Sequence, residues 1–176
     1  MKSLQTVQKI MGVFRVLTLV AAICCFVGAA GALIGLASVA VASALSEPGF
    51  FNELMELMEC NGLYEAIVGC IEGFVIALNQ GVLLMMLHGY IKREREDGTP
   101  FTQRGAKELT KLGVLYIVMP IVAAIIVAVV GACFKVEPTE LSNGHAVGFG
   151  ITLLILSAVF RYGAELEAKL AEKQGA

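Results

Sequence analysis

The chain of 176 residues has few charged side chains, no tryptophan, only two histidines and only five cysteines. Charged residues make up 16% of the sequence, and the 13 basic residues nearly balance the 15 acidic ones. This composition excludes a disordered chain, a disulfide-dense secreted scaffold and a basic nucleic-acid-binding protein. Apolar residues, in contrast, make up 57% of the chain, which is too many for a soluble domain of this length. We therefore expect an integral membrane protein.

The residue combinations that catalytic and metal sites require are missing as well. The five cysteines form no CxxC pair, and no histidine stands at metal-ligand spacing from another ligand. The chain also contains no phosphate-binding loop and no nucleotide fingerprint. We therefore predict a non-enzymatic protein without metal or cofactor. Cys60 and Cys133 are both expected near the outer surface, where a disulfide can persist, but the sequence does not show whether they are close.

Four apolar runs are long enough to cross a bilayer, which needs about 20 apolar helical residues. They cover residues 16–45, 64–91, 112–134 and 142–160. The first run is too long for a cleaved signal peptide, whose apolar region has about 7–15 residues, so we expect it to be retained. No polar segment is long enough to form a second domain. Residues 1–176 are therefore expected to form a single all-α domain, an integral membrane bundle of four transmembrane helices.

The distribution of charge predicts how the bundle is oriented. Of the 13 basic residues, all but Lys135 lie before the first run, between the second and third, or after the fourth. Short loops rich in Lys and Arg stay in the cytoplasm, so both termini are predicted to be cytoplasmic. Acidic residues sort to the opposite side: the two outer segments contain Glu47, Glu53, Glu56, Glu59, Glu137 and Glu140.

The first outer segment has the pattern of a short amphipathic helix at residues 50–60, which Gly62 is placed to stop. One interpretation is an interfacial helix that rests on the membrane, and the other is a lid or ligand surface. The first is favoured, because amphipathic segments are stable at an interface without any function. Four apolar residues share one face and two acidic ones oppose them, namely Phe51, Leu54, Met55 and Met58 against Glu53 and Glu56.

The helix predicted at 64–91 carries an unusual polar face. Glu65, Glu72, Asn79 and Gln80 fall on one broad arc of it. A charge near the bilayer centre costs about 2.5–3.5 kcal/mol on insertion scales, so Glu72 should not face lipid. Two interpretations stay open. The four residues line a site for a proton, a cation or a small molecule with Glu72 as the titrating group, or they hold helices together by hydrogen bonds.

Small residues recur every fourth position on the same helix, a pattern that lets another helix approach closely. The first run offers a similar pair, so we expect these two helices to be neighbours. The predicted packing residues are Gly69, Gly73, Ala77 and Gly81 on one helix and Gly31 and Gly35 on the other.

Two stretches carry a resemblance to a known family. Asp97-Gly98-Thr99-Pro100-Phe101-Thr102, then Leu109 and Leu112-Gly113, introduces the third run, and Val159–Glu167 closes the fourth. Both stretches resemble the bacterial membrane-protein family described as domain of unknown function 2975, whose layout of four spans is similar over essentially the whole chain. Residues 168–173 depart from the acidic continuation of that family. The resemblance implies a bacterial cytoplasmic membrane and a small cytoplasmic helix-turn-helix regulator as partner, and it supplies no established activity.

The same two stretches have an expected physical role. Pro100, Phe101 and Thr102 should anchor and cap the return into the third run. Arg161 and Glu165 are one helical turn apart, so they should form an ion pair as the fourth run ends.

These observations favour a regulatory or sensory membrane protein that presents a basic surface to a cytoplasmic partner. We expect this surface to contain Arg93, Arg95, Arg104 and Arg161, with the segment that follows Arg161. The mixed charges at 92–96 argue against direct binding of nucleic acid. The alternative is a small transporter or an immunity-type membrane protein that uses Glu72. It would act as a homo-oligomer in the lipid bilayer, because four short spans enclose little volume.

Overall fold

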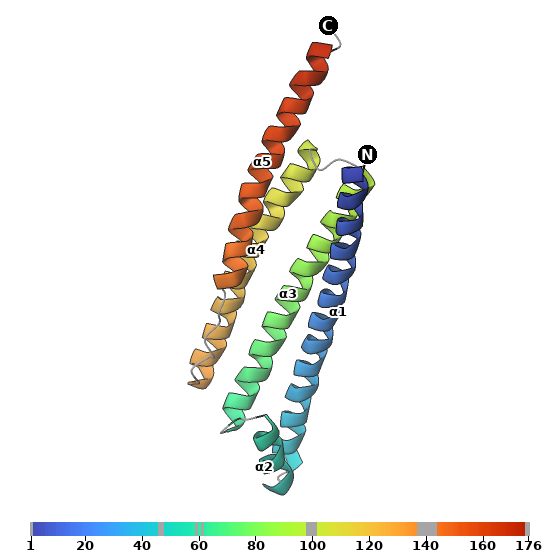
Figure 1. Cartoon of the computed structure of the whole chain (residues 1–176). Helices are drawn as coiled ribbons and strands as arrows, with labels where there is room; N and C mark the ends of the chain where they lie inside the picture. Colours follow the sequence, from blue (N-terminus) through green and yellow to red (C-terminus); the bar gives the residue numbers. More distant parts are fainter. Residues whose placement is uncertain are drawn as a thin grey trace. The chain divides into compact units, whose positions relative to one another are not determined.

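Figure 1 shows the computed structural model of the chain, which describes residues 2–45, 48–58, 60, 62–97, 102–136 and 144–174. Within these residues the chain forms five α-helices and no β-strand. The all-α class predicted from the sequence is therefore confirmed. The helices are α1 (Lys2–Leu45), α2 (Pro48–Leu57), α3 (Leu63–Asp97), α4 (Gln103–Phe134) and α5 (Gly144–Gln174).

Four of these helices are long and apolar enough to cross a membrane. Their membrane-length segments are Lys9–Ala44, Leu63–Arg95, Gln103–Phe134 and Ala146–Leu166. Three helices continue well past the predicted apolar runs: α1 begins at Lys2, α4 begins at Gln103 and α5 ends at Gln174. Charged residues sustain these extensions, because Arg and Glu are good helix formers and pair one turn apart.

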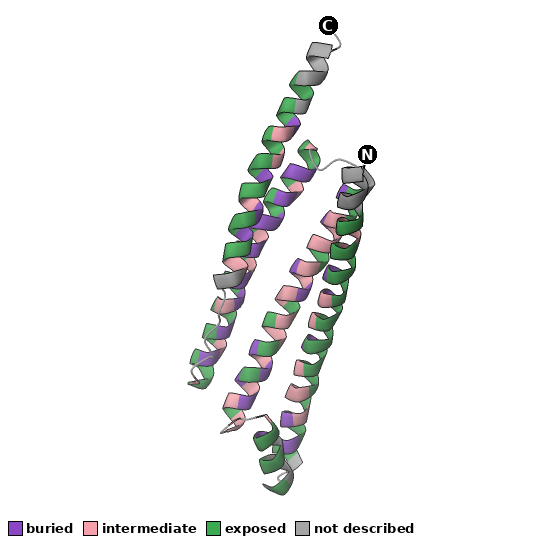
Figure 2. Cartoon of the chain, in the orientation of Figure 1, coloured by how far each residue is buried: buried purple, intermediate pink, exposed green. Residues whose placement is uncertain are grey.

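The long helices expose many large apolar side chains. Figure 2 shows α1 exposed along most of its length, and Val16, Val27 and Ile34 are each at least 60% exposed. Water would make so much exposed apolar surface unfavourable, whereas lipid tails accept it. The four apolar helices and their exposed apolar faces indicate a multi-pass membrane protein.

The short helix α2 lies where an amphipathic helix was expected, with different ends. It begins at Pro48 and ends at Leu57, and the N–H of Cys60 then donates a hydrogen bond to the carbonyl of Met55 at 3.0 Å. Gly62 does not stop α2. Its carbonyl accepts a hydrogen bond from the N–H of Ala66 at 3.1 Å, which begins α3. Of the outer acidic residues, Glu47, Glu59, Glu137 and Glu140 lie outside the described residues.

Thr102 caps the N-terminus of α4. Its Oγ1 accepts a hydrogen bond from the N–H of Gly105 at 2.9 Å, and its carbonyl accepts one from Ala106 at 3.0 Å. These bonds satisfy amide groups that have no partner within the helix. Pro100 and Phe101, which were expected to share this role, lie outside the described residues.

The chain divides into two compact units. Unit 1 comprises residues 1–22, 82–119 and 143–176, and unit 2 comprises residues 23–81 and 120–142. Helices α1, α3 and α4 contribute residues to both units, and Pro120 within α4 stands at the boundary.

In unit 2, α1 and α3 pack against each other in antiparallel directions (Figure 1). As the residue number rises along α1, the number of its neighbour on α3 falls, and small side chains keep the helices close. A Cβ added at the glycine of each pair would lie 3.9 Å from its partner for Gly28–Ala77 and for Gly73–Ala32, and 3.2 Å for Gly35–Cys70.

Of the six predicted packing residues, Gly35, Gly73, Ala77 and Gly81 lie in the contact between α1 and α3, and Gly31 and Gly69 do not. Gly31 and Gly69 are exposed, and a Cβ added at either would meet nothing within 4 Å. The reason is that the line of contact passes over Ala32 and Cys70, one residue further along each helix. Gly81 does lie in the contact, because a Cβ there would be 3.2 Å from the ring of Phe26.

The core of unit 1 is formed by α3, α4 and α5. Tyr116 of α4 also meets Phe149 of α5 edge to face, with ring centroids 5.0 Å apart. This core places the end of α3 beside the beginning of α4. Its buried residues are Leu83, Tyr90, Leu109, Leu112, Tyr116 and Leu153.

Candidate functional site

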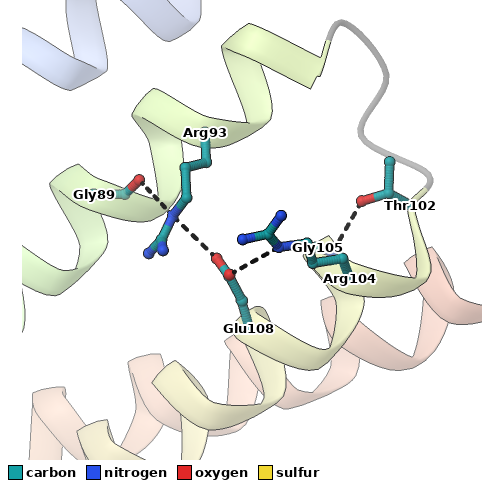
Figure 3. Close-up of polar contacts among 6 residues, drawn as sticks. All are labelled: Gly89, Arg93, Thr102, Arg104, Gly105 and Glu108. Atoms are coloured by element: carbon teal, nitrogen blue, oxygen red, sulfur yellow. Dashed lines mark hydrogen bonds and ion pairs between the residues drawn. The ribbon is translucent and has the colours of Figure 1, made fainter.

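A cluster of charged residues lies in unit 1, where α3 ends and α4 begins (Figure 3). The Nε of Arg93 on α3 is 3.3 Å from Oε2 of Glu108 on α4, and it also donates a hydrogen bond to the carbonyl of Gly89 at 3.2 Å. On the other side of the same carboxylate, the Nε of Arg104 is 3.6 Å from Oε1. One carboxylate therefore holds two arginines from two helices.

A second carboxylate is buried in the same cluster. Glu94 follows Arg93 on α3 and is only 5% exposed. It packs against Gly105 so closely that a Cβ at residue 105 would collide with its carboxylate and lie 2.8 Å from Oγ1 of Thr102. The cap of α4 and the end of α3 therefore meet at a glycine that has no room for a side chain.

Beside this cluster, α3 and α4 border an open groove with a volume of about 290 Å³. Its wall changes from apolar to charged along its length. We call it the α3–α4 groove, and it is lined by Met85, Met86, Gly89, Tyr90, Arg93, Glu108, Lys111 and Leu112.

The part of α5 around Arg161 forms a further polar region with α4. Arg161 pairs with Glu165 at 3.5 Å, as expected from their spacing. Thr110 of α4 donates a hydrogen bond to Ser157 of α5 at 3.2 Å. Two hollows, of about 330 and 530 Å³, share Thr110, Arg161 and Glu165 in their linings.

Two other basic residues of unit 1, Arg95 and His88, lie against α1. Arg95 is exposed, and its guanidinium lies near Gly12 of α1, where an added Cβ would be 3.7 Å away. The Nδ1 of His88 donates a hydrogen bond to the carbonyl of Arg15 at 3.0 Å, which joins α3 to α1 within this unit. Among the described residues, Arg95 has no ion-pair partner, in contrast to Arg93, Arg104 and Arg161.

The polar arc of α3 lies in unit 2. Glu72 is buried at 8% exposure, whereas Glu65 and Gln80 are half-buried. The Oδ1 of Asn79 is buried without a hydrogen-bond partner. No hydrogen bond or ion pair joins Glu72, Asn79 and Gln80 to one another in the described part of the chain.

In the described part of the chain, neither the cysteines nor the residues that could bind a metal form a disulfide or a metal site. All five cysteines are described, and all are free thiols, so no disulfide joins Cys60 to Cys133 in this structure. The thiol of Cys60 donates a hydrogen bond to the carbonyl of Met58. Within the described ranges, no group of three His, Cys, Asp or Glu side chains is placed to hold a metal ion.

No protein-family model, no curated protein and no solved structure matches this chain.

Sequence reasoning pointed to the arginines and missed the carboxylate that organises them. The spacing of Arg104 and Glu108, one turn apart on α4, was visible in the sequence and could have suggested their pairing. The contact of Arg93 with Glu108 could not have been found in this way, because it depends on how α3 meets α4. The same holds for Glu94, whose burial against Gly105 joins residues of two helices.

Proposed function

We propose that this chain is a non-enzymatic integral membrane protein that binds a cytoplasmic partner protein through the basic end of unit 1. The observation that carries the proposal is a set of exposed cations with no ion pair among the side chains that the structure describes, which do not include those of residues 96–101. These cations are Lys92 and Arg95 on α3 and Lys107 and Lys111 on α4. The ion pair of Arg93 with Glu108 joins the two helices that carry these cations.

The expected orientation places this end in the cytoplasm. Loops rich in Lys and Arg are retained there, and the resemblance described above favours a bacterial cytoplasmic membrane. Intact cells and inverted membrane vesicles treated with a membrane-impermeant maleimide would test the orientation. The exposed thiol of Cys133 should react in intact cells, and a cysteine that replaces Lys169 should react only in inverted vesicles. The opposite result would reverse the orientation.

The partner would carry an acidic surface, and the resemblance favours a small helix-turn-helix regulator. The test is purification of the tagged protein from its native membrane in mild detergent, with quantitative mass spectrometry against an untagged control. We expect one soluble partner at a fixed ratio, lost in the double variant Arg95→Glu/Lys107→Glu. Lys135→Glu is the matched control, because it reverses an exposed lysine of unit 2. Retention of the partner by the double variant, or equal loss in the control, contradicts the proposal.

A second candidate function is supported by the buried polar groups of α3. The burial of Glu72 and the unsatisfied Oδ1 of Asn79 are costly in a membrane unless they serve a ligand, an ion or a second copy of the chain. This favours a small transporter or an immunity-type protein that acts as a homo-oligomer. In proteoliposomes, Glu72→Gln should then abolish a pH-dependent flux while the variant stays folded. A change in stability alone would mark Glu72 as structural.

A further inference from the structure

We propose that the α3–α4 groove binds one anionic phospholipid. Arg93 and Lys111 would hold its phosphate, and Met85, Met86 and Leu112 would contact the beginning of its acyl chains. The proposal adds a lipid ligand to the protein and does not depend on the partner-binding function.

The net charge of the groove lining is complementary to a ligand with one negative charge. Its lining contains two cations, Arg93 and Lys111, and one carboxylate, Glu108. Glu108 also pairs with Arg104, which stands outside the lining. The lining therefore keeps a net positive charge, which matches the one negative charge of a phosphodiester such as the headgroup of phosphatidylglycerol.

The donors of the groove remain available to a ligand. The ion pair and the hydrogen bond that hold Arg93 both use Nε, so the N–H groups of the two terminal nitrogens can bind phosphate oxygens. Lys111 is exposed and has no ion-pair partner among the described residues. Arg93 is thus fixed in position before the lipid arrives, which lowers the entropy cost of binding.

The apolar half of the groove indicates a lipid and not a free anion. Met85 and Met86 are 44% and 41% exposed, and both lie in a segment that can cross a membrane. Met85 stands eight residues before Arg93, which is about 12 Å along the helix. Thioether side chains are flexible and adapt to irregular apolar ligands. A free phosphate would use only the charged end of the groove and leave this apolar wall uncovered.

The test is native mass spectrometry of the full chain, purified in detergent, with dioleoylphosphatidylglycerol or dioleoylphosphatidylcholine added at increasing concentrations. We expect one tightly bound phosphatidylglycerol and weaker binding of phosphatidylcholine. Lys111→Gln should weaken the binding of phosphatidylglycerol about fivefold, the effect of one basic residue near an anionic headgroup. Lys107→Gln is the matched control. It removes an exposed lysine one turn away on the same helix that lines a different hollow.

Two further measurements test whether the ligand is a lipid that occupies the whole groove. Met86→Trp fills the groove and changes no charge, so it should also weaken phosphatidylglycerol binding. Inorganic phosphate at the same concentrations should not displace the lipid. The proposal is overturned if the two lipids bind equally, if Lys107→Gln acts as strongly as Lys111→Gln, or if inorganic phosphate competes. The partner test changes Arg95 and Lys107, neither of which lines the groove, so failure here and failure of the partner proposal are distinguishable.

Discussion

Gly113 of α4 and Gly150 of α5 lie backbone against backbone. A Cβ added at Gly113 would be 3.0 Å from the carbonyl oxygen of Gly150, and a Cβ added at Gly150 would be 2.9 Å from the carbonyl oxygen of Gly113. Each glycine thus leaves room for the backbone of the other helix. Close approach of this kind is how helices associate in lipid, where no hydrophobic effect drives them together.

Replacing either glycine by alanine should destabilise unit 1. In Gly113→Ala and Gly150→Ala the new methyl group meets a backbone oxygen, which cannot move aside as a side chain does. We expect a loss of about 1–3 kcal/mol in the free energy of unfolding, the usual cost of overpacking. Unfolding in mixed detergent micelles, followed by circular dichroism, measures it.

The control for these variants is Gly148→Ala, which lies on α5 with Gly150. Gly148 is exposed, and a Cβ there would meet nothing within 4 Å. Alanine has the higher helix propensity, so this variant should be unchanged or slightly more stable. Similar losses in all three variants would show that the loss does not come from the contact between α4 and α5.

The sequence predicted the helices well because their cause is local. An apolar run of about 20 residues must form a helix in lipid, where every backbone group needs a partner within the same segment. The ends of the helices were less predictable. Charged residues such as Arg161 and Glu165 support either a helix or a solvated loop, and only their contacts decide between the two.

Contacts between helices were predicted only in part, because they depend on residues of two helices at once. Repeated small residues indicated that α1 and α3 approach each other, but the exact contact depends on side chains that the spacing does not reveal. In the structure, the contact includes Ala32 and Cys70 and leaves out Gly31 and Gly69. The α3–α4 groove joins residues about 20 positions apart on different helices, and no pattern within one helix points to it.

Lys135 should be a favourable position for glycine. It follows the last residue of α4 with a positive φ of 56°, and the N–H of Val136 donates a hydrogen bond to the carbonyl of Gly131 at 3.0 Å. This is a Schellman cap, in which a residue with a Cβ is strained. We expect Lys135→Gly to raise the free energy of unfolding by about 1 kcal/mol. Lys135→Ala removes the same charge and keeps the Cβ, so a similar gain in this variant would refute the explanation.

The pair Arg93–Glu108 should contribute more to stability than the pair Arg161–Glu165. The side chain of Glu108 is 22% exposed and that of Glu165 is 49% exposed, so water screens the second pair more strongly. Double-mutant cycles with Gln at each position should give a coupling energy of about 0.5–1 kcal/mol for the first pair and less for the second. Added salt should reduce both. A larger coupling for Arg161–Glu165 would contradict this prediction.

Cys60 should react slowly with thiol reagents at neutral pH. Burial raises the pKa of its thiol above the ordinary value, and the negative charge of the Glu65 carboxylate raises it further. Only the thiolate attacks maleimides and iodoacetamide, so a raised pKa leaves less of the reactive form at any given pH. The alkylation rate of Cys60 should therefore reach half of its maximum at a higher pH than that of a solvent-exposed thiol. Peptide mass spectrometry after timed labelling measures the rate at each cysteine.

Glu65→Gln separates the two causes of this shift. The variant removes the charge and leaves the burial, so the pKa of Cys60 should fall part of the way and its alkylation at about pH 8 should become faster. Cys133, at the exposed end of α4, is the internal control and should label at the same rate in both proteins. The prediction fails if the rate at Cys60 does not change, or if both cysteines change together. If neither cysteine labels until a reductant is added, the two form in the membrane the disulfide that the sequence left open, in contrast to the free thiols of this structure.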